Sequence, residues 1–465
     1  MKKLFAFLLI VPVLIMGCDK PGKNGRTEED DLNGEEFAKA APRVKDGDVV
    51  LANSELSEKF LTEVTYPDKD LSFTKIYDYY GGFRENGELT WSNWNKNWPD
   101  GDKPSSYSIR WKKLDDITIS YTLHLEDALG WSQDLDIKAN SSYVDITNLV
   151  PNDTYTFSVK ANDDNKTVMA SGTFSTTGSV HQVFFKSKCR NARDLGGWKT
   201  TDGKTIRYRR IYRGGRMNDP WETMLSRTGE KEVVAEGIGA ELELRGSDDY
   251  MTVPAVKGLD HCHPCIEEGG KVMLGVTKPS AKNCAKWLVF DDSSPWSAEK
   301  KAPYLKDDGI INKDKLGEIT PTAEEYAAFQ AAYKAKTKEC FEFVLNSVKA
   351  GKGVYFHCSL GRDRTGTMSI LLMGILGVRE GDISKEYELT YFAPVGFSVS
   401  SSDEESNPKP VFNNTRMHWV YSDIVPYFWS LSTDGTFANG VENYLLNIGV
   451  TKAQINEFRS TMLVD

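Results

Sequence analysis

The residue types best suited to chemistry lie together in one short segment, His357-Cys358-Ser359-Leu360-Gly361-Arg362-Asp363-Arg364-Thr365-Gly366. Five residues separate the cysteine from the second arginine. A loop that leads into a helix N-terminus offers backbone N–H donors and a favourable dipole to a phosphoryl dianion. The same surroundings can lower a cysteine pKa from about 8.5 to roughly 3.5–7.5. We therefore expect Cys358 to be a thiolate nucleophile for phosphorus, with phosphate bound by Ser359 through Thr365.

The flanking side chains of this loop suit the same chemistry. Arg364 can present its planar guanidinium to two phosphoryl oxygens, which lysine cannot do bidentately. The Thr365 hydroxyl is placed to stabilise the thiolate when it leaves. His357 is expected to orient the loop through a hydrogen bond and not to act as a base. The alternative is a buried cysteine beside a surface arginine; rhodanese-like enzymes also use a loop cysteine, but their loop is one residue shorter.

Such a loop needs a strand before it and a helix after it. Gly353–His357 is a short apolar run that predicts a strand, and Thr365–Leu376 has the apolar residues of a helix. Ala240–Arg245 alternates, with Glu241, Glu243 and Arg245 on one face. Strand, loop and helix in this order predict an α/β domain over residues 179–465, with a central, mostly parallel sheet flanked by helices and ligands at the carboxyl ends of the strands.

A long helix and an insertion lie upstream of the loop. Thr322-Ala-Glu-Glu325 has the form of a capping box, and the helix should run to about Lys349 and stop at Gly351. Residues from about 247 to 319 show no clear period and include His261-Cys-His-Pro-Cys265. We do not expect a metal there, because adjacent ligands cannot easily share one tetrahedral site and no second cluster completes it. A disulfide or simple loop residues remain the alternatives.

Residues 49–178 have the pattern of a β-sandwich. Short alternating runs at Tyr107–Trp111, Ile117–His124, Tyr143–Ile146 and Thr154–Lys160 are separated by turn residues. The stretch from Ile146 to Val159 resembles the end of a fibronectin type III module, which implies that Tyr155 is its corner tyrosine and Trp111 a core residue.

The amino terminus has the layout of a secretory signal. Lys2 and Lys3 precede an apolar run that ends at Gly17, and residues 14–18 resemble the lipobox of bacterial lipoproteins. That resemblance implies cleavage after residue 17 and lipidation of Cys18, with residues 18–48 as a flexible tether. We expect an exported protein anchored to a bacterial membrane, on its periplasmic face or at the cell surface. An ordinary cleaved signal with a chance cysteine is the alternative.

Charge and cysteine content exclude some classes of function. The net charge of −10 disfavours nucleic acid as a partner, although the run from Arg207 to Arg216 is basic. An acidic chain with one basic cluster indicates a small anionic ligand. Beyond Cys18, six cysteines are too sparse for a disulfide framework in a chain of 465 residues.

Four segments together resemble the bacterial tyrosine/serine phosphatase family, distant relatives of the dual-specificity phosphatases. The loop is similar to the family pattern HCxxGKDRTG, and Arg190–Gly197 is similar to its N-x-R-D-L-G-G signature. Ile211–Arg216 is similar to its Y-R-S-G strand, and Glu243-Leu-Arg245 stands in place of its D-L-R. The resemblance covers residues 180–465, includes the closing helices, and implies supporting roles for Arg193, Asp194, Arg213 and Arg245.

The general acid stays open between two carboxyl groups. The resemblance implies Asp363, which is retained in the family's loop. It could instead pair with Arg193 or Arg213 and brace the loop. Glu243 is the second candidate, because it ends a strand beside the loop, but the family has aspartate there. Arg193 and Asp194 could also serve only to fix a turn.

The resemblance implies a phosphomonoesterase that needs no metal or cofactor and acts through a phosphocysteine. The expected substrate is a phosphorylated protein, chiefly at tyrosine, or a small phosphoester. Arg362 in place of the family's lysine leaves phosphoinositides or inositol phosphates as an alternative, and a solvated loop charge as another. A surface lipoprotein that only binds phosphorylated ligands is a further alternative, as is carbohydrate adhesion through Trp91, Trp94 and Trp98.

Overall fold

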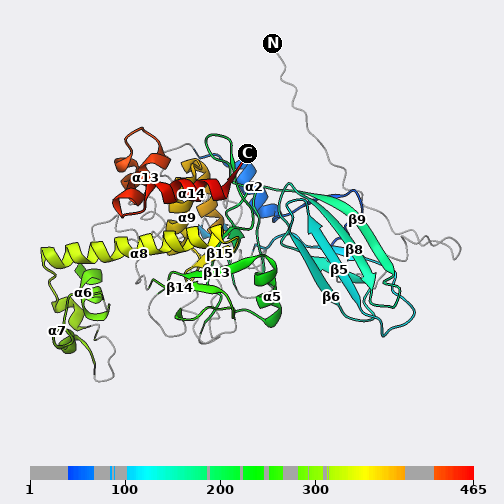
Figure 1. The fold of residues 1–465 in the computed structure, drawn as a ribbon, viewed down its shortest axis with the longest axis horizontal. Coiled ribbons are helices and arrows are strands. Elements are labelled where there is room, and N and C mark those ends of the chain that lie inside the picture. Colours follow the sequence, from blue (N-terminus) through cyan, green and yellow to red (C-terminus); the bar gives the residue numbers. More distant parts are fainter. Residues whose placement is uncertain are drawn as a thin grey trace, which may run out of the picture.

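The computed structural model describes two domains, a β-sandwich followed by an α/β domain (Figure 1). The residues it describes are 40–66, 84–85, 88–89, 102–185, 189–219, 224–245, 251–264, 281–291, 293–306, 312, 314–392 and 424–465. This is the order of domains and the fold class that the sequence predicts.

The sandwich has a large sheet and a small one. The large sheet has the order β1-β9-β8-β5-β6 and is formed by Val49–Leu51, Val168–Thr177, Thr154–Ala161, Tyr121–Asp127 and Ser132–Ile137. Facing it, β4 (Tyr107–Arg110) pairs antiparallel with β7 (Tyr143–Ile146). The short strands β2 (Arg84–Glu85) and β3 (Glu88–Leu89) pair antiparallel in a separate two-stranded sheet.

The aromatic residues predicted for the sandwich core are buried in it. Trp111 is 1% exposed and packs on Tyr121. The Tyr155 hydroxyl accepts a hydrogen bond from the Val150 N–H at 2.8 Å, as the corner-tyrosine prediction requires. One predicted strand is shorter than expected, because Ile117 lies in a turn held by Asp116 and the strand begins only at Tyr121.

The sheet of the α/β domain has the strand order β10-β12-β15-β13-β14. The strands are Arg193–Asp194, Ile211–Gly214, Gly353–His357, Ile238–Glu243 and Asp260–Cys262. All neighbours are parallel except β10 and β12, which confirms the mostly parallel sheet. At its margin, β11 (Thr205–Ile206) pairs with β16 (Leu463–Val464) near the end of the chain.

Helices cover both faces of this sheet. One face packs Leu242, Val354 and Phe356 into a core shared with α8 (Ala323–Lys349), α9 (Asp363–Leu376), α13 (Phe437–Asn447) and α14 (Lys452–Met462). The other face packs Tyr212 and Tyr355 beside α5 (Arg227–Ala235). Around α9 lie α10 (Glu380–Glu388), the 3-10 turn η6 (Leu389–Tyr391) and α12 (Val425–Leu431). The capping box of α8 forms as predicted, with Thr322 and Glu325 bonded reciprocally.

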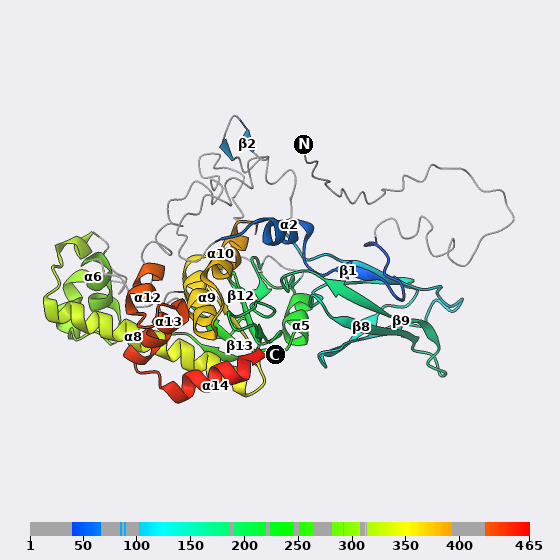
Figure 2. The same ribbon diagram turned by 90° about the horizontal axis from the view of Figure 1, so that it is seen from above.

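The segment before the sandwich differs from the predicted tether and domain boundary. Val44 is already 2% exposed in the sandwich core, and Arg43 bridges to Ser108. Helix α2 (Glu55–Glu63) packs on the α/β domain: Phe60 lies 5.2 Å from the Phe392 ring, and the Lys385 ammonium reaches the Leu61 carbonyl (Figure 2). Phe60 and Leu61 of α2 are therefore part of the core of the second domain.

The insertion at residues 247–319 contains regular structure. It supplies the edge strand β14, helices α6 (Ala281–Phe290) and α7 (Ala298–Lys301), and the 3-10 turns η4 (Ala302–Tyr304) and η5 (Lys315–Glu318). Trp287 of α6 packs on Phe329 of α8, so the insertion shields the far end of that helix (Figure 1). Among the helices described, none is both long and apolar enough to cross a bilayer.

Candidate active site

The segment from Cys358 to Arg362 forms the loop between β15 and α9, at the carboxyl end of the central strand. Cys358 is 4% exposed, whereas Ser359, Leu360, Asp363 and Arg364 are half-buried. Helix α9 begins at Asp363, so its N-terminal N–H groups and positive dipole end face the loop. The strand, loop and helix predicted from the sequence are confirmed.

Outward hydrogen bonds fix the direction of the loop's peptide groups. The Ser359 carbonyl accepts from the Arg216 N–H at 3.2 Å, and the Gly361 carbonyl accepts from Asn191 Nδ2 at 2.8 Å and from the Arg213 guanidinium. In a trans peptide the next N–H points the opposite way from the carbonyl. The N–H groups that follow these carbonyls therefore point into the loop, where an anion would bind.

Gly361 permits this turn because it has no side chain. Its φ is +68°, and a Cβ at this position would overlap the Gly214 carbonyl on the neighbouring strand. Any other residue would have to push the loop away from β12.

The Cys358 thiol lies in surroundings that favour its ionised form. Burial alone would raise the pKa of Cys358, but the Arg364 guanidinium and the hydroxyl and N–H of Thr365 outweigh burial and lower it. Burial raises the pKa of the other four described cysteines, to about 12 for Cys189, Cys262 and Cys284. Cys358 is thus the thiol in the described part of the chain that the fold prepares as a nucleophile. All five are free cysteines.

Arg364 and Thr365 lie where the sequence predicts a phosphate clamp and a leaving-group donor. Arg364 Nη1 donates to the Leu244 carbonyl at 3.0 Å, which holds the guanidinium beside the end of β13. The Thr365 hydroxyl oxygen is buried and has no other hydrogen-bond partner among the described residues than the neighbouring thiol. Its donor is therefore available to Cys358.

Arg193 and Arg213 brace the loop from behind through Glu386 of α10. Arg193 Nε donates to Glu386 Oε1 at 2.7 Å, and Arg213 Nη1 lies 3.4 Å from the same oxygen. Arg213 also contacts Thr390 at 3.2 Å, and Asn191 Nδ2 contacts the same hydroxyl. All four charged or hydroxyl side chains are buried. Two guanidiniums thus share one carboxylate behind the loop.

Asp363 does not pair with Arg193 or Arg213. Its carboxylate instead accepts from Arg362 Nε and Nη2, both at 3.1 Å. The Asp363 side chain is 24% exposed, whereas that of Arg362 is 5% exposed. The acid at the loop rim is therefore the partly solvated member of the pair, and Arg362 is turned inward instead of lying as a solvated loop charge.

Glu243 is held as an ionised carboxylate. Arg245 donates to it through its backbone N–H at 2.8 Å and through its guanidinium, and His357 Nε2 lies 3.7 Å away. Burial would raise the pKa of Glu243, but His357 and Arg245 outweigh burial and lower it. The Glu243 side chain is also fully buried, so no solvent proton reaches it, and the geometry favours Glu243 as a positioning residue.

Asp194 points away from the loop. Its carboxylate accepts from the Gly196 N–H at 2.8 Å and from the Arg209 N–H, and its other neighbour is His181 at 3.3 Å. These contacts hold a turn next to the sandwich. Asp194 therefore has the turn-fixing role that was one of its two predicted alternatives. Its neighbour Arg193 points to the opposite side, into the brace.

Sequence reasoning missed Asn191, Glu241, Glu386 and Thr390. Asn191 stands inside the Arg190–Gly197 motif and could have been found there, and Glu241 shares a strand face with Glu243 and Arg245. Glu386 and Thr390 are far from the loop in sequence, and no local pattern marks them. Cys18, Cys265 and the three tryptophans proposed for adhesion lie outside the described residues.

Comparison with known proteins gives two matches to domain families and one related protein. The sequence model of the tyrosine phosphatase family matches residues 186–464, and that of the fibronectin type III domain matches residues 93–177. A protein of Cupriavidus necator named "Putative tyrosine-protein phosphatase" is 26% identical over 201 residues. The match covers 42% of this chain and 59% of that relative, so the chain spans about three fifths of its length.

Proposed function

The chain belongs to the tyrosine phosphatase family, and from that premise we propose that it is a protein-tyrosine phosphatase acting through a phosphocysteine at Cys358. The observation that supports this proposal best is the combination of a lowered Cys358 pKa with backbone N–H groups that point into the loop. A thiolate and an anion cradle are the two parts that a phosphoryl transfer of this kind requires.

In the first step the Cys358 sulfur attacks phosphorus, forming an S–P bond while the bond to the tyrosyl oxygen breaks. Arg364 and the loop N–H groups hold the non-bridging oxygens, on which the charge of the transition state resides. In the second step water attacks phosphorus, the S–P bond breaks, and the Thr365 hydroxyl stabilises the returning thiolate. Inorganic phosphate leaves.

Asp363 is our choice for the group that protonates the leaving tyrosyl oxygen and then accepts a proton from water. It is the acid at the loop rim, and its side chain is partly exposed. The ion pair with Arg362 keeps the carboxyl group oriented.

The ion pair between Arg362 and Asp363 favours a phosphoprotein over a phosphoinositide as substrate. A second phosphate group would need a cation that is open at the rim, and the Arg362 side chain is 5% exposed and already bound to Asp363. We therefore keep the single phosphomonoester as the proposed substrate.

Phosphate release from phosphotyrosine peptides in EDTA tests the proposal, with the wild-type chain compared with Cys358→Ser. We expect release by the wild type and a loss of at least about 10³-fold in the variant, because serine at this position is not ionised. Phosphoserine peptides and phosphoinositides are the comparison substrates. Equal release by the variant would contradict the cysteine mechanism, and release from phosphoinositides alone would contradict the proposed substrate. Binding without release by the wild type would favour a phospholigand-binding protein.

We further propose that the protein is exported and anchored through an acylated Cys18. The support is the signal-like sequence of residues 1–17 and the cysteine that follows it. Metabolic labelling with a radioactive fatty acid in a bacterial host tests this proposal. Label that is lost in Cys18→Ser is the expected result, and equal labelling of both proteins would contradict it.

A further inference from the structure

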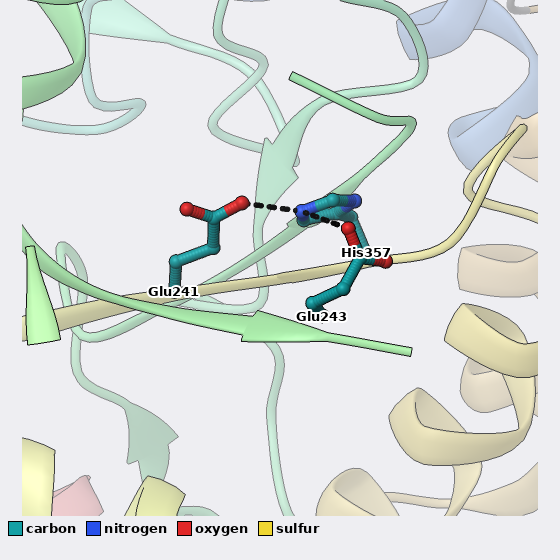
Figure 3. A group of neighbouring side chains, drawn as sticks. All are labelled: Glu241, Glu243 and His357. Carbon is teal, nitrogen blue, oxygen red and sulfur yellow. Dashed lines mark hydrogen bonds and ion pairs between the residues drawn. The ribbon is translucent and has the colours of Figure 1, made fainter. Parts of the chain in front are cut away.

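His357 is enclosed by charged groups on the face of the sheet that carries α5. Its Nε2 lies 2.8 Å from Glu241 Oε1 and 3.7 Å from Glu243 Oε2, and all three side chains are fully buried (Figure 3). The register places Glu241 beside Tyr355 and Glu243 beside His357 on adjacent strands. His261 on β14 is the register partner of Glu241 on β13, and Arg245 forms an ion pair with Glu243. These groups, with the Cys358 thiol, are the titratable and charged neighbours of the imidazole.

The two ring nitrogens of His357 meet two groups that only accept hydrogen bonds. Nε2 faces the Glu241 carboxylate, and Nδ1 lies 3.3 Å from the Cys358 carbonyl oxygen. A neutral imidazole carries one N–H and can satisfy one of these acceptors, whereas an imidazolium satisfies both. Burial opposes the charged ring, but Glu243 and Glu241 outweigh burial and raise the pKa of His357.

We propose that Glu241 is a positioning residue for phosphate binding, which keeps His357 doubly protonated so that its Nδ1–H holds the Cys358 carbonyl. With that carbonyl turned toward His357, the N–H of Ser359 points the other way, into the loop. Through His357, Glu241 thereby orients the Ser359 N–H, the first donor of the phosphate-binding loop, without touching the substrate. This inference rests on the proposed function, because it assigns a task to the same loop.

Glu241 is itself fixed by the inserted segment. The Ala255 N–H donates to Glu241 Oε2 at 2.6 Å, and β14 from the same segment pairs with β13 beside it. This gives the first part of the insertion a role: it orients the carboxylate that acts on His357.

A metal ion is the competing occupant of this cluster. Glu241, Glu243 and His357 offer ligand atoms that all lie within 4.8 Å of one another. Binding a metal would require His357 to lose its proton and Glu243 to give up its bonds to Arg245. Two carboxylates facing one imidazolium and one guanidinium are already balanced in charge, so we favour the ion-paired state.

The first test is the protonation state of His357, measured by ¹⁵N NMR on the whole chain with labelled histidine. There are six histidines in the sequence, and the His357→Asn spectrum identifies the resonance. We expect both ring nitrogens of the wild type to be protonated at neutral pH, and Glu241→Gln to lower the pKa of His357. A neutral His357 in the wild type would overturn the proposal even if the variant failed to fold.

The second test is the affinity for inorganic phosphate, measured by titration calorimetry in EDTA. Glu241→Gln should weaken binding about three- to tenfold, the range expected for the loss of one aligned hydrogen bond. The matched control is Glu236→Gln. Glu236 is also buried, and its Oε2 lies 3.7 Å from Nε2 of the buried His181, but this pair lies at the boundary with the sandwich. The control should leave both the His357 pKa and the phosphate affinity unchanged.

Two results would overturn the positioning role. One is a lowered His357 pKa in Glu241→Gln with unchanged phosphate affinity. The other is a stoichiometric metal in the purified wild type that Glu241→Gln loses, since the cluster would then be a metal site. The His357 pKa and the phosphate affinity are both measured without turnover. If the wild type binds phosphate but hydrolyses no phosphoester, the proposed function is contradicted and this inference still holds.

Discussion

At the scale of single residues, the described cysteines have surroundings that shift their pKa values in opposite directions. Cys358 faces Arg364 and Thr365, which lower its pKa, whereas Cys189 lies between the Tyr355 hydroxyl and the Gly215 carbonyl, where burial raises its pKa to about 12. The difference comes from what each sulfur faces, because both are buried. The proposed attack on phosphorus therefore falls to Cys358.

Asp363→Asn should separate the binding of substrate from proton transfer. We expect kcat for phosphotyrosine peptides to fall about 10²-fold, because the leaving oxygen no longer receives a proton. An aryl phosphate with a very acidic leaving group, such as p-nitrophenyl phosphate, should lose much less. Steady-state kinetics on both substrates measures this contrast. Equal losses on the two would show that Asp363 acts only through its bonds to Arg362.

The raised pKa of His357 makes folding stability depend on pH in a definite direction. A histidine whose folded pKa exceeds its ordinary value of 6.5 stabilises the fold fully below that value, and the contribution is lost as pH rises through the folded pKa. Urea unfolding from about pH 6 to about pH 9 should show this loss in the wild type, and His357→Asn should show a flatter profile. Parallel profiles for the two proteins would contradict the assignment of a charged imidazole.

At the scale of elements, the loop depends on how closely β12 and β15 approach each other. Gly214 on β12 and Gly361 in the loop meet without side chains between them. Gly366 does the same on the helix side, where a Cβ would overlap the Tyr387 ring. The glycines of the motif are therefore steric requirements of packing as much as of the turn itself.

Gly361→Ala should cost both stability and activity. We expect a loss of about 1–3 kcal/mol in the free energy of unfolding, with phosphate release nearly abolished, because the loop must move off β12. Gly351→Ala is the matched control: its φ is +78°, and a Cβ there meets nothing within 4 Å. The control should lose about 1 kcal/mol and keep full activity. Normal activity in Gly361→Ala would contradict the packing argument.

The central strand, loop and two helices could be predicted because local sequence determines them. The capping box at Thr322 begins α8, and the apolar run of β15 leads directly into the loop. Strands β6 and β9 were missed because their polar or small residues give no clear alternation. The Glu386 brace and the packing of α2 depend on contacts between residues nearly two hundred or more positions apart, which no local pattern contains.

At the scale of the whole molecule, the sandwich and the α/β domain share a polar contact around Arg209. This buried arginine has φ +57° and pairs with Asp127 of the sandwich, and its guanidinium lies 4.2 Å from the Trp131 ring centroid. Trp131 Nε1 in turn donates to the Ala235 carbonyl at 2.7 Å. The Arg209 N–H also donates to Asp194, next to the brace residue Arg193. The sandwich is thus joined to the α/β domain by buried bonds.

Asp127→Asn should destabilise the chain by about 2–4 kcal/mol, because the variant removes the carboxylate that hydrogen-bonds the buried Arg209 guanidinium and leaves Glu236, 3.6 Å away, to pair with it. Thermal unfolding monitored by calorimetry measures the loss. The control is Asp134→Asn on β6, whose carboxylate pairs with His124 but is 70% exposed, and which should change stability by less than about 0.5 kcal/mol. Equal effects of the two substitutions would show that the two domains are not energetically coupled at this contact.

The central claim is that phosphate passes through Cys358. The most direct measurement is acid quenching of the wild-type chain during turnover of a phosphotyrosine peptide, followed by mass spectrometry of the peptide that contains residues 357–364. We expect a phosphoryl group on the Cys358 sulfur during turnover and none in Cys358→Ser. Phosphate release at the normal rate with no phosphorylated Cys358 at any quench time would contradict it.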